Sequence, residues 1–337
     1  MKLLVTGGAG FIGSHFVRRM LQTSDIKLLV NLDKLTYAGH LDNIKDLTRD
    51  KRYRFVRGDI NDVRLVERLL KGMDALVNFA AETHVDRSIH NAAPFLQTNV
   101  AGTQVLLAAA KHLKLPRFLH ISTDEVYGSI ARGHARETDP LNPSSPYAAS
   151  KAAADLLVMS YATTFGLPVL ITRAANNYGP YQYPEKFLPL FITHALEGQP
   201  LPLYGDGKNI RDWLHVSDHC AAIERVLRKG RVGEIYNIGT GVEYSNVDVA
   251  HVLLKRLGRS KSLIRYVPDR LGHDRRYAMS IAKISSELGW RPSTPFKEGF
   301  PQLIDWYMAH QSWWQPILHR SKAYKQYYAR QYARRHG

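Results

Sequence analysis

The stretch that decides the fold is Thr6-Gly7-Gly8-Ala9-Gly10-Phe11-Ile12-Gly13, which lies near the beginning of the chain. It follows an apolar run, residues 2–6, and opens a segment, residues 11–21, whose apolar residues recur with helical spacing. Its glycines satisfy both the G-x-G-x-x-G and the G-x-x-G-x-x-G spacing. Glycines let the backbone turn sharply and approach a pyrophosphate at the positive N-terminus of a helix. The stretch therefore predicts a strand, a tight phosphate-binding turn and a helix.

An acidic residue ends the second predicted strand, at the position where it could bind the ribose of a nucleotide. Asp33 ends the next apolar run, residues 27–32, about 20 residues after Gly13. A carboxylate here accepts hydrogen bonds from an adenosine ribose and repels a 2′-phosphate, so the sequence favours NAD over NADP. Asp59 and residues 79–81 follow later strands, and we expect them to line the adenine and the ribose. The alternative for these residues is ordinary packing at strand ends.

Strand-like and helix-like segments alternate as far as Thr172. The segments read as strands are residues 54–56, 75–79, 117–122 and 168–172, and those read as helices are residues 63–70, 94–112 and 148–165. Regular alternation predicts right-handed crossovers and a doubly wound parallel (Rossmann-type) sheet of the α/β class.

Beyond Thr172 the alternation fails. Residues 176–207 are rich in Pro, Tyr and Gly, with a helix expected near residues 187–197, and a strand at residues 234–238 returns to the sheet before a helix at residues 247–257. We therefore expect a smaller, mixed α/β substrate domain. The expected divisions are residues 1–175 plus about 213–242 for NAD, residues 176–212 plus 243–315 for the substrate, and a basic tail at residues 316–337.

The chain is strongly basic. It carries 46 Lys and Arg against 30 Asp and Glu, a formal net charge of +16, which attracts nucleic acid, a membrane surface or a small diphosphate. Residues 319–337 contain six Lys and Arg, no acid and four interleaved tyrosines. Such a tail could stack on single-stranded nucleic acid, but a solvated or partner-packed terminal helix is the reading that we prefer.

The cysteine content and the hydropathy bound the cellular setting. Cys220 is the only cysteine, so no intrachain disulfide can form, which fits a reducing cytoplasm. We expect this thiol to be a small buried apolar group. No apolar run reaches the ~18 residues that a membrane span needs, and no leader segment is visible, so we expect a soluble, intracellular protein. The spacing of histidines with this cysteine suggests no metal site.

Tyr147 and Lys151 form a Y-x-x-x-K pair, one turn apart on one face of a predicted helix. An ammonium there, with a positive nicotinamide nearby, would lower the tyrosine pKa, so that the phenolate takes a hydroxyl proton while a hydride leaves the same carbon. Alone, such a pair could be a surface pair. With the glycine motif and a strand ending in Ser122-Thr123, it resembles the extended branch of the short-chain dehydrogenase/reductase superfamily.

Two adjacent carboxyls, Asp124 and Glu125, follow Thr123. A simple oxidoreductase or a C4 epimerase needs only the tyrosine, the lysine and a hydroxyl donor. Once C4 of a hexose is a ketone, the C5 proton is acidic, so one carboxylate can remove it while a carboxylic acid protonates the departing C6 hydroxyl. Neighbouring side chains on a strand face opposite ways, so the chain must leave the sheet at Thr123. The alternative is a solvated acidic turn.

Further motifs make the resemblance close over residues 1–310. The chain is similar to the dTDP-glucose 4,6-dehydratase family in AAETHVDRS (80–88), TDE (123–125), NNYGP (176–180), PEK (184–186), YGDG (204–207), RDWL (211–214) and DRLGHD (269–274). The resemblance implies that Tyr147 is the C4 base supported by Lys151, that Thr123 holds the C4 oxygen, that Asp124 is the acid at C6 and that Glu125 takes the C5 proton. Hydride then returns to C6, so a tightly bound NAD is regenerated at each turnover.

The resemblance also implies the binding residues. The cofactor site would comprise Gly7, Gly10, Phe11, Ile12, Gly13, Asp33, Lys34, Thr36, Asp59, Ile60, Phe79, Ala80, Ala81, Thr98, Tyr147, Lys151 and Asn177. The substrate site would comprise Thr83, Thr123, Asn176, Lys186, Phe187, Pro202, Tyr204, Arg211, Asn246, Arg270 and His273. Arginine forks suit a diphosphate, although any one of them could be a surface charge. His273, like His84, could equally be a packed histidine.

Several alternatives remain open. The runner-up is an epimerase or decarboxylase of the same superfamily, and the acidic pair argues against it. An NAD-binding sensor or a nucleic-acid-binding protein is suggested only by the charge and the tail. Thymine and uracil differ by one methyl group, worth about 1–3 kcal/mol in a fitted pocket, so UDP-glucose competes with dTDP-glucose as the substrate. We also expect a homodimer through the alanine-rich helices of residues 94–112 and 148–165.

Overall fold

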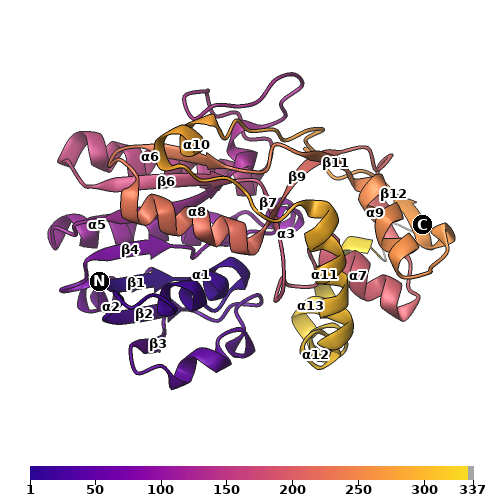
Figure 1. Ribbon diagram of the computed structural model, residues 1–337, viewed down its shortest axis with the longest axis horizontal. Coiled ribbons are helices and arrows are strands. Elements are labelled where there is room, and N and C mark those ends of the chain that lie inside the picture. The colour runs from indigo at the N-terminus through magenta and orange to yellow at the C-terminus, as the bar shows by residue number, and fades with distance from the viewer. Residues whose placement is uncertain (333–337) are drawn as a thin grey trace.

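The computed structural model describes residues 1–332 and is built around one parallel sheet. The sheet has seven strands in the order β10-β6-β5-β4-β1-β2-β3 (Figure 1), and all registered pairs are parallel. The strands are β1 (Lys2–Thr6), β2 (Leu28–Asp33), β3 (Tyr53–Arg57), β4 (Ala75–Asn78), β5 (Phe118–Thr123), β6 (Val169–Ala174) and β10 (Ile235–Ile238). The order in which the chain adds strands reverses between β1 and β4, because β2 and β3 lie to one side of β1 and the later strands to the other. In such sheets, ligands bind at the carboxyl ends of the strands beside that point.

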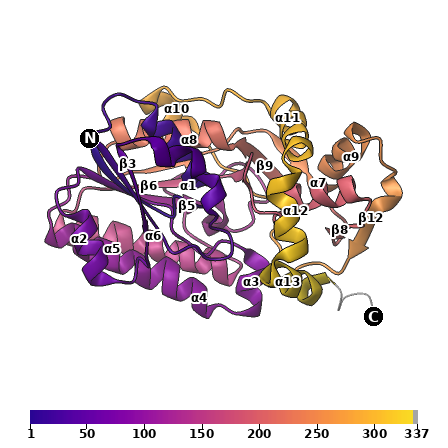
Figure 2. The ribbon, with the colours of Figure 1, turned by 90° about the horizontal axis from the view of Figure 1, so that it is seen from below.

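Helices cover both faces of the sheet, which confirms the doubly wound α/β fold (Figure 2). One face is covered by α1 (Phe11–Leu21), α8 (Val216–Lys229) and α10 (Ala282–Leu288). The other is covered by α2 (Val63–Leu70), α5 (Thr103–His112) and α6 (Pro146–Phe165). The strands inside the sheet are therefore buried on both sides, which explains why their sequences are largely apolar runs rather than alternating ones, whereas the edge strand β3 is only partly buried and carries two exposed arginines.

A smaller body with its own core lies beside the carboxyl ends of the strands (Figure 1). Its strands are β7 (Asn176–Tyr178), β8 (Leu201–Tyr204), β9 (Ile210–His215), β11 (Glu243–Ser245) and β12 (Ile264–Val267). Its helices are α7 (Phe187–Glu197), α9 (Asn246–Arg256), α11 (Phe296–Ala309), α12 (Gln311–Arg320) and α13 (Lys322–Tyr332). They pack in one apolar cluster, for which α7 supplies Leu188, Phe191 and Ile192.

Short helical elements lie between these strands and helices. They are η1 (Leu41–Asn43), η2 (Lys45–Arg49), α3 (Val85–His90), α4 (Ala93–Phe95), η3 (Leu96–Gly102), η4 (Asp124–Tyr127) and η5 (Lys261–Leu263). Helix α10 lies in the segment that we expected in the substrate domain, yet Ile284 and Leu288 are buried in the core of the large sheet. Within residues 1–332, no helix is both long and apolar enough to cross a bilayer.

The helix expected over residues 94–112 is interrupted. After α4, residues 96–102 form the wider π-helical turns of η3 before α5 begins at Thr103. The amide of Asn99, inside η3, donates to the Glu82 carbonyl at 3.0 Å and accepts from the Glu82 N–H at 2.9 Å. It also donates to the Ser150 hydroxyl at 2.8 Å. A wider turn of this kind commonly marks a functional site, and here it ties the helix to the strand end after β4.

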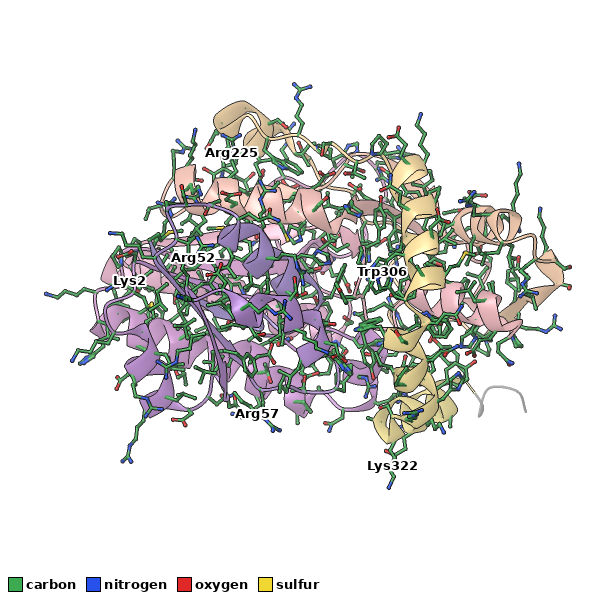
Figure 3. The ribbon with its side chains drawn as sticks, turned by 60° about the horizontal axis from the view of Figure 1, so that its bottom comes forward. Lys2, Arg52, Arg57, Arg225, Trp306 and Lys322 are labelled. Carbon is green, nitrogen blue, oxygen red and sulfur yellow. The ribbon has the colours of Figure 1, made fainter. Side chains whose placement is uncertain are left out.

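The described part of the basic tail packs as helices. Tyr324, Tyr327 and Tyr332 of α13 are buried, while Lys322 of the same helix is exposed. A terminal helix was expected, but it is neither solvated nor packed on a partner here: it packs against the smaller body of the same chain, and residues 333–337, with Arg334 and Arg335, lie outside the described residues. Basic side chains are spread over the surface: Figure 3 shows Lys2, Arg57 and Lys322 pointing outward from different elements.

Candidate active site

A cavity of about 300 Å³ runs along the carboxyl ends of the large sheet, from the glycine turn to α6. Gly7 has φ +73°, and a Cβ there would lie 2.7 Å from the backbone nitrogen of Ala80. A Cβ on Gly13 would lie 2.3 Å from the carbonyl oxygen of Gly7. Only glycine fits these two positions, so no side chain at them separates the backbone of the turn from the cavity. The N-terminus of α1 then faces the space where a pyrophosphate would lie, so the residues present fit a dinucleotide.

The acid expected at the ribose end lies in the same cavity. Asp33 accepts hydrogen bonds from the N–H groups of Ala9 at 2.9 Å and Leu35 at 2.8 Å. Burial raises the pKa of Asp33, and these two hydrogen bonds oppose the rise. Nearby, Lys34 Nζ lies 2.6 Å from Asp59 Oδ2. This bridge joins the ends of two adjacent strands and fixes the far rim of the cavity.

Helix α6 begins where its capping residues require. The Ser145 hydroxyl accepts from the Ala148 N–H at 3.1 Å, and Pro146 occupies the first turn. Tyr147 and Lys151 then face the cavity one turn apart. Lys151 Nζ donates to the Ile121 carbonyl at 2.7 Å and lies 3.3 Å from His120 Nε2. These contacts with β5 fix the Lys151 ammonium beside the carboxyl end of that strand.

Burial is the largest influence on the pKa of both members of this pair. Burial raises the pKa of Tyr147 far above its usual value, and the nearby charge of Glu125 adds to the rise, while the Thr123 hydroxyl opposes it. The lowered tyrosine pKa that we expect with a positive nicotinamide nearby stays a prediction, because these directions describe the protein without NAD. Burial also lowers the pKa of Lys151 to about 8, with Asp155 opposing the fall. Desolvation thus disfavours the charged forms of both groups in the protein without NAD, and a positive charge near Tyr147 would favour tyrosinate.

The acidic pair follows β5 directly, and the chain leaves the sheet there as expected. Thr123 caps the short helix η4: its hydroxyl accepts from the Glu125 N–H at 3.3 Å and donates to Asp124 Oδ1 at 3.1 Å. A helical turn in place of a strand brings both carboxyls to the same cavity. After Tyr127 the chain turns at Gly128, with φ +71°, and leaves the site.

Burial and nearby charges affect the pKa values of the two carboxyls differently. Burial and then the charge of Glu125 raise the pKa of Asp124 well above its usual value. Burial also raises the pKa of Glu125, but this side chain faces three cations, Arg270, Lys186 and Arg211, which oppose the rise. Asp124 therefore favours the protonated form more strongly than Glu125 does. A neighbouring pair with one acid and one base is what an elimination requires.

A second cavity of about 140 Å³ continues from Glu125 into the smaller body. Arg211 donates to the Asp274 carbonyl at 2.9 Å, and its guanidinium lies 4.2 Å from the centre of the Tyr277 ring. Lys186 Nζ donates to the Thr83 carbonyl at 2.7 Å. With Arg270, these groups line the cavity with positive charge, which suits a diphosphate.

Every site residue expected from the sequence lines one of these two cavities. All of the expected catalytic and cofactor residues line the first cavity, together with Thr83 and Asn176 of the substrate set. The other expected substrate residues, apart from Thr123 in the first cavity, line the second: Lys186, Phe187, Pro202, Tyr204, Arg211, Asn246, Arg270 and His273. Glu125, Asn176 and Lys186 border both cavities, so they lie at the junction where a sugar would meet its diphosphate.

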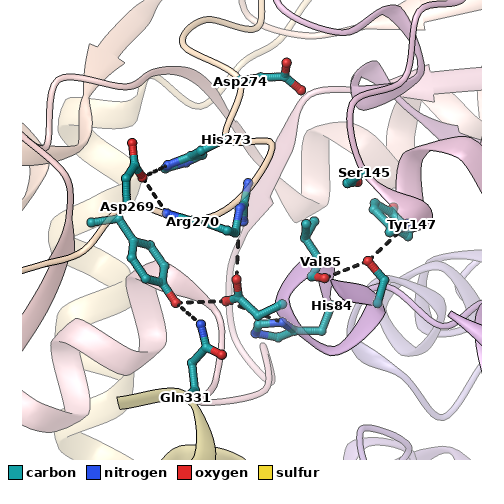
Figure 4. Close-up of polar contacts among 12 residues, drawn as sticks. His84, Val85, Ser145, Tyr147, Asp269, Arg270, His273, Asp274 and Gln331 are labelled. Atoms are coloured by element: carbon teal, nitrogen blue, oxygen red, sulfur yellow. Dashed lines mark hydrogen bonds and ion pairs between the residues drawn. The ribbon is translucent and has the colours of Figure 1, made fainter. Parts of the chain in front are cut away.

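Sequence reasoning missed four residues of the second cavity that matter to its geometry. Tyr277 donates to Asp274 at 2.8 Å and lies 3.5 Å from Glu125 Oε2, so it braces the acidic pair. Asp86 is buried beside Arg270, and Trp213 and Tyr332 complete the wall. In the view of Figure 4, His84 and Gln331 both lie below Arg270 and His273. Asp86 and Trp213 belong to motifs on which the resemblance rests, AAETHVDRS and RDWL. No motif around Tyr277 or Tyr332 indicated that these residues belong to the site.

Comparisons with known proteins agree with this geometry. The family model described as GDP-mannose 4,6 dehydratase matches residues 4–303. A dTDP-glucose 4,6-dehydratase of Streptomyces niveus is 53% identical, with 94% of this chain and 96% of that protein covered. The crystal structure of DesIV, the dTDP-glucose 4,6-dehydratase of Streptomyces venezuelae, with NAD and dTDP bound, has a TM-score of 0.93, 53% identity and coverage of 94% of this chain and 100% of that one.

An epimerase structure is more distant. UDP-glucuronic acid 4-epimerase from Bacillus cereus, in complex with UDP-glucuronic acid and NAD, has a TM-score of 0.87 and 32% identity, with 92% of this chain and 99% of that chain covered. Enzymes that catalyse other reactions therefore share this architecture. The sequence identity distinguishes them, because it is 53% to the dehydratase structure and 32% to the epimerase structure.

Proposed function

The chain belongs to the dTDP-glucose 4,6-dehydratases of the extended short-chain dehydrogenase/reductase superfamily, and from that premise we propose how its own residues carry out the reaction. The enzyme is an NAD-dependent lyase that converts dTDP-glucose to dTDP-4-keto-6-deoxyglucose. The observation that carries the assignment is the turn Thr123–Asp124–Glu125, which faces Tyr147 and Lys151 across one cavity.

The first step removes a proton from the C4 hydroxyl. Tyr147 is the base, Lys151 supports the tyrosinate charge from below, and the Thr123 hydroxyl holds the C4 oxygen. Bound NAD supplies the hydride acceptor for C4, a positive charge near Tyr147, and later the hydride for C6. Because burial raises the pKa of Tyr147, deprotonation depends on that added positive charge and on the ammonium of Lys151.

The second step eliminates water between C5 and C6. Glu125 takes the C5 proton, since the cations around it favour its carboxylate, and Asp124 protonates the departing C6 hydroxyl, since its environment favours the carboxylic acid. The hydrogen bond from Thr123 and the brace of Tyr277 orient the two groups. Arg211 and Arg270 bind the diphosphate in the second cavity, beyond Glu125.

A direct experiment tests this function. The purified protein, incubated with dTDP-glucose and no added reductant, should release a sugar nucleotide with the mass of the substrate minus one water and a 4-keto group. Parallel incubations with UDP-glucose and CDP-glucose rank the nucleobases, for which we expect dTDP-glucose to have the highest kcat/KM. A product of unchanged mass would identify an epimerase instead.

The remaining proposals concern the organisation of the protein. The NAD domain comprises residues 1–175 and about 213–242, and the substrate domain comprises residues 176–212 and 243–315, with α10 packed on the former. We place the enzyme in the cytoplasm as a homodimer without nucleic-acid or membrane partners. The dimer surface is the face of η3, α5 and α6, where Leu96 is 55% and Leu156 is 63% exposed. The buried thiol of Cys220 fits a reducing compartment.

A further inference from the structure

The C-terminal helix α13 reaches the second cavity, although the family match ends at residue 303. Tyr332 lines this cavity together with Arg211 and Arg270. Its ring lies parallel to that of Tyr204, with centroids 6.1 Å apart and planes inclined by 29°. A helix of the basic tail therefore forms part of the wall of the nucleotide subsite.

One side chain of α13 bridges the two bodies of the protein. Gln331 is 1% exposed, and its Nε2 donates to the Tyr204 hydroxyl at 2.5 Å. Its Oε1 lies 2.8 Å from His90 Nε2. His90 ends α3 beside the large sheet, whereas Tyr204 ends β8 in the smaller body. Gln331 thus ties the two sides of the subsite together.

The bridge continues to a buried carboxylate. Tyr204 donates to Asp86 Oδ2 at 3.1 Å, and the Tyr327 hydroxyl of α13 lies 3.3 Å from the same oxygen. The other oxygen, Oδ1, accepts no hydrogen bond from any described residue and lies 4.0 Å from Arg270 Nε. Two tyrosine hydroxyls therefore contact one oxygen of the Asp86 carboxylate, and the other oxygen lies nearer the Arg270 guanidinium.

We propose that α13 is a clasp for the nucleotide diphosphate: Gln331 and Tyr327 hold Tyr204 and Asp86, and Asp86 holds Arg270 in the orientation that receives the phosphates. The inference rests on the proposed function in taking a nucleoside diphosphate as the ligand of Arg270. Gln331 and Tyr327 are positioning residues, because they act on the ligand through other side chains. They should change ligand affinity and leave the chemical step alone.

The test compares Gln331→Ala with Gln326→Ala, the same change on the exposed face of the same helix. Titration calorimetry with dTDP gives Kd, and steady-state kinetics with dTDP-glucose give KM and kcat. Loss of a buried hydrogen bond should raise both Kd and KM about five- to tenfold in Gln331→Ala, with kcat within twofold of wild type. Gln326→Ala should match the wild type in all three.

A second pair isolates the hydroxyl contact without disturbing packing. Tyr327→Phe should raise the Kd of dTDP, whereas Tyr328→Phe, its half-buried neighbour, should not. Equal Kd values within both pairs, or a fall in kcat at constant KM, would overturn the clasp. If the wild-type enzyme binds dTDP but forms no 4-keto product, the proposed function fails, and the Kd comparisons still decide the role of α13.

Discussion

The buried carboxylate of Asp155 lies behind Tyr147 and Lys151 and influences the pKa of Lys151. Asp155 follows Lys151 by one turn of α6, and its Oδ2 accepts from Arg173 Nε at 2.8 Å. Its Oδ1 lies 3.8 Å from His120 Nε2, and the Ser122 hydroxyl faces it from β5. Burial lowers the pKa of His120 well below its usual value, so this ring stays neutral at neutral pH. Among these neighbours, Asp155 is the group that favours the charged form of Lys151.

Asp155→Asn should therefore move the pH dependence of activity downward. Burial lowers the pKa of Lys151 to about 8 even with Asp155 present, so activity that needs the ammonium is lost as the pH rises through that value. Without the carboxylate the ammonium is less stable, and the loss should begin at a lower pH. The measurement is kcat/KM against pH, with the exposed Asp42→Asn as the control. An unchanged alkaline limb in Asp155→Asn would contradict this account.

The two adjacent carboxyls should fail in different ways when neutralised. Glu125→Gln should still oxidise C4 but block elimination, so bound NADH accumulates on mixing with substrate and C5 exchanges little solvent deuterium. Asp124→Asn should oxidise C4 and retain some C5 exchange, because only protonation of the leaving hydroxyl is lost. Turnover of each should fall by at least about 10²-fold, the lower end for a general acid or base.

Tyr147→Phe is the reference for this pair, since no base remains for the C4 hydroxyl and every step should be suppressed. Nicotinamide absorbance, deuterium incorporation by mass spectrometry and product formation together distinguish the three variants. Near-normal turnover in both carboxyl variants would mean that the acidic pair is structural and that the reaction has been misassigned.

At the scale of elements, the turn after β5 depends on the glycine that ends it. Gly128 has φ +71°, and a Cβ there would lie 2.2 Å from the Asn142 carbonyl oxygen. Gly133 has the same φ of +71°, but a Cβ there would meet nothing within 4 Å. The two positions share a positive φ, which strains any side chain. Gly128 also has ψ −161°, a region that essentially only glycine adopts, and only Gly128 meets a steric clash.

Gly128→Ala should consequently cost more than Gly133→Ala. A positive φ strains the side chain in either variant, and a sparsely populated backbone conformation costs about 1–3 kcal/mol, which would lower Tm by a few degrees. In Gly128→Ala the clash must also move η4, so both Tm and kcat should fall further than in Gly133→Ala. Thermal unfolding and turnover assays check this, and equal losses in the two variants would show that the turn tolerates the shift.

Elements with a local signal could be predicted from the sequence, and elements defined by distant contacts could not. Helices α1, α2 and α7 begin and end at the expected residues, because apolar periodicity and end signals lie within each segment. The π turns of η3 depend on Asn99 reaching Glu82 and Ser150, which no periodicity records.

The same distinction applies to the site. The glycine turn, the Y-x-x-x-K pair and the acidic pair are short motifs, so they were visible, and the substrate residues came from resemblance. Tyr277 lies 152 positions from Glu125, and Gln331 lies 127 positions from Tyr204, so only the fold brings these pairs together. The raised pKa of Tyr147 was also out of reach, because it follows from burial in the folded protein.

At the scale of the whole molecule, we expect an apolar helix face to be covered by a second copy. Leu96, Leu156 and Phe165 are 55%, 63% and 48% exposed on η3 and α6. Light scattering at micromolar concentration should give twice the chain mass. Leu156→Glu should give a monomer, whereas Val232→Glu, which changes an equally apolar residue that is 50% exposed outside these helices, should remain a dimer. A monomeric wild type would reject this surface.

The position of β10 in the sheet has a consequence for how the protein is made. This strand pairs with β6, but residues 175–234 lie between them, and much of the smaller body is encoded in that interval. At about 5–20 residues per second, a ribosome takes roughly 3–12 s to synthesise it. Throughout that time β6 has no partner on one side, and an open strand edge is a template for aggregation. Synthesis that stalls within this interval should therefore leave a nascent chain that depends on chaperones until Ile235–Ile238 emerges.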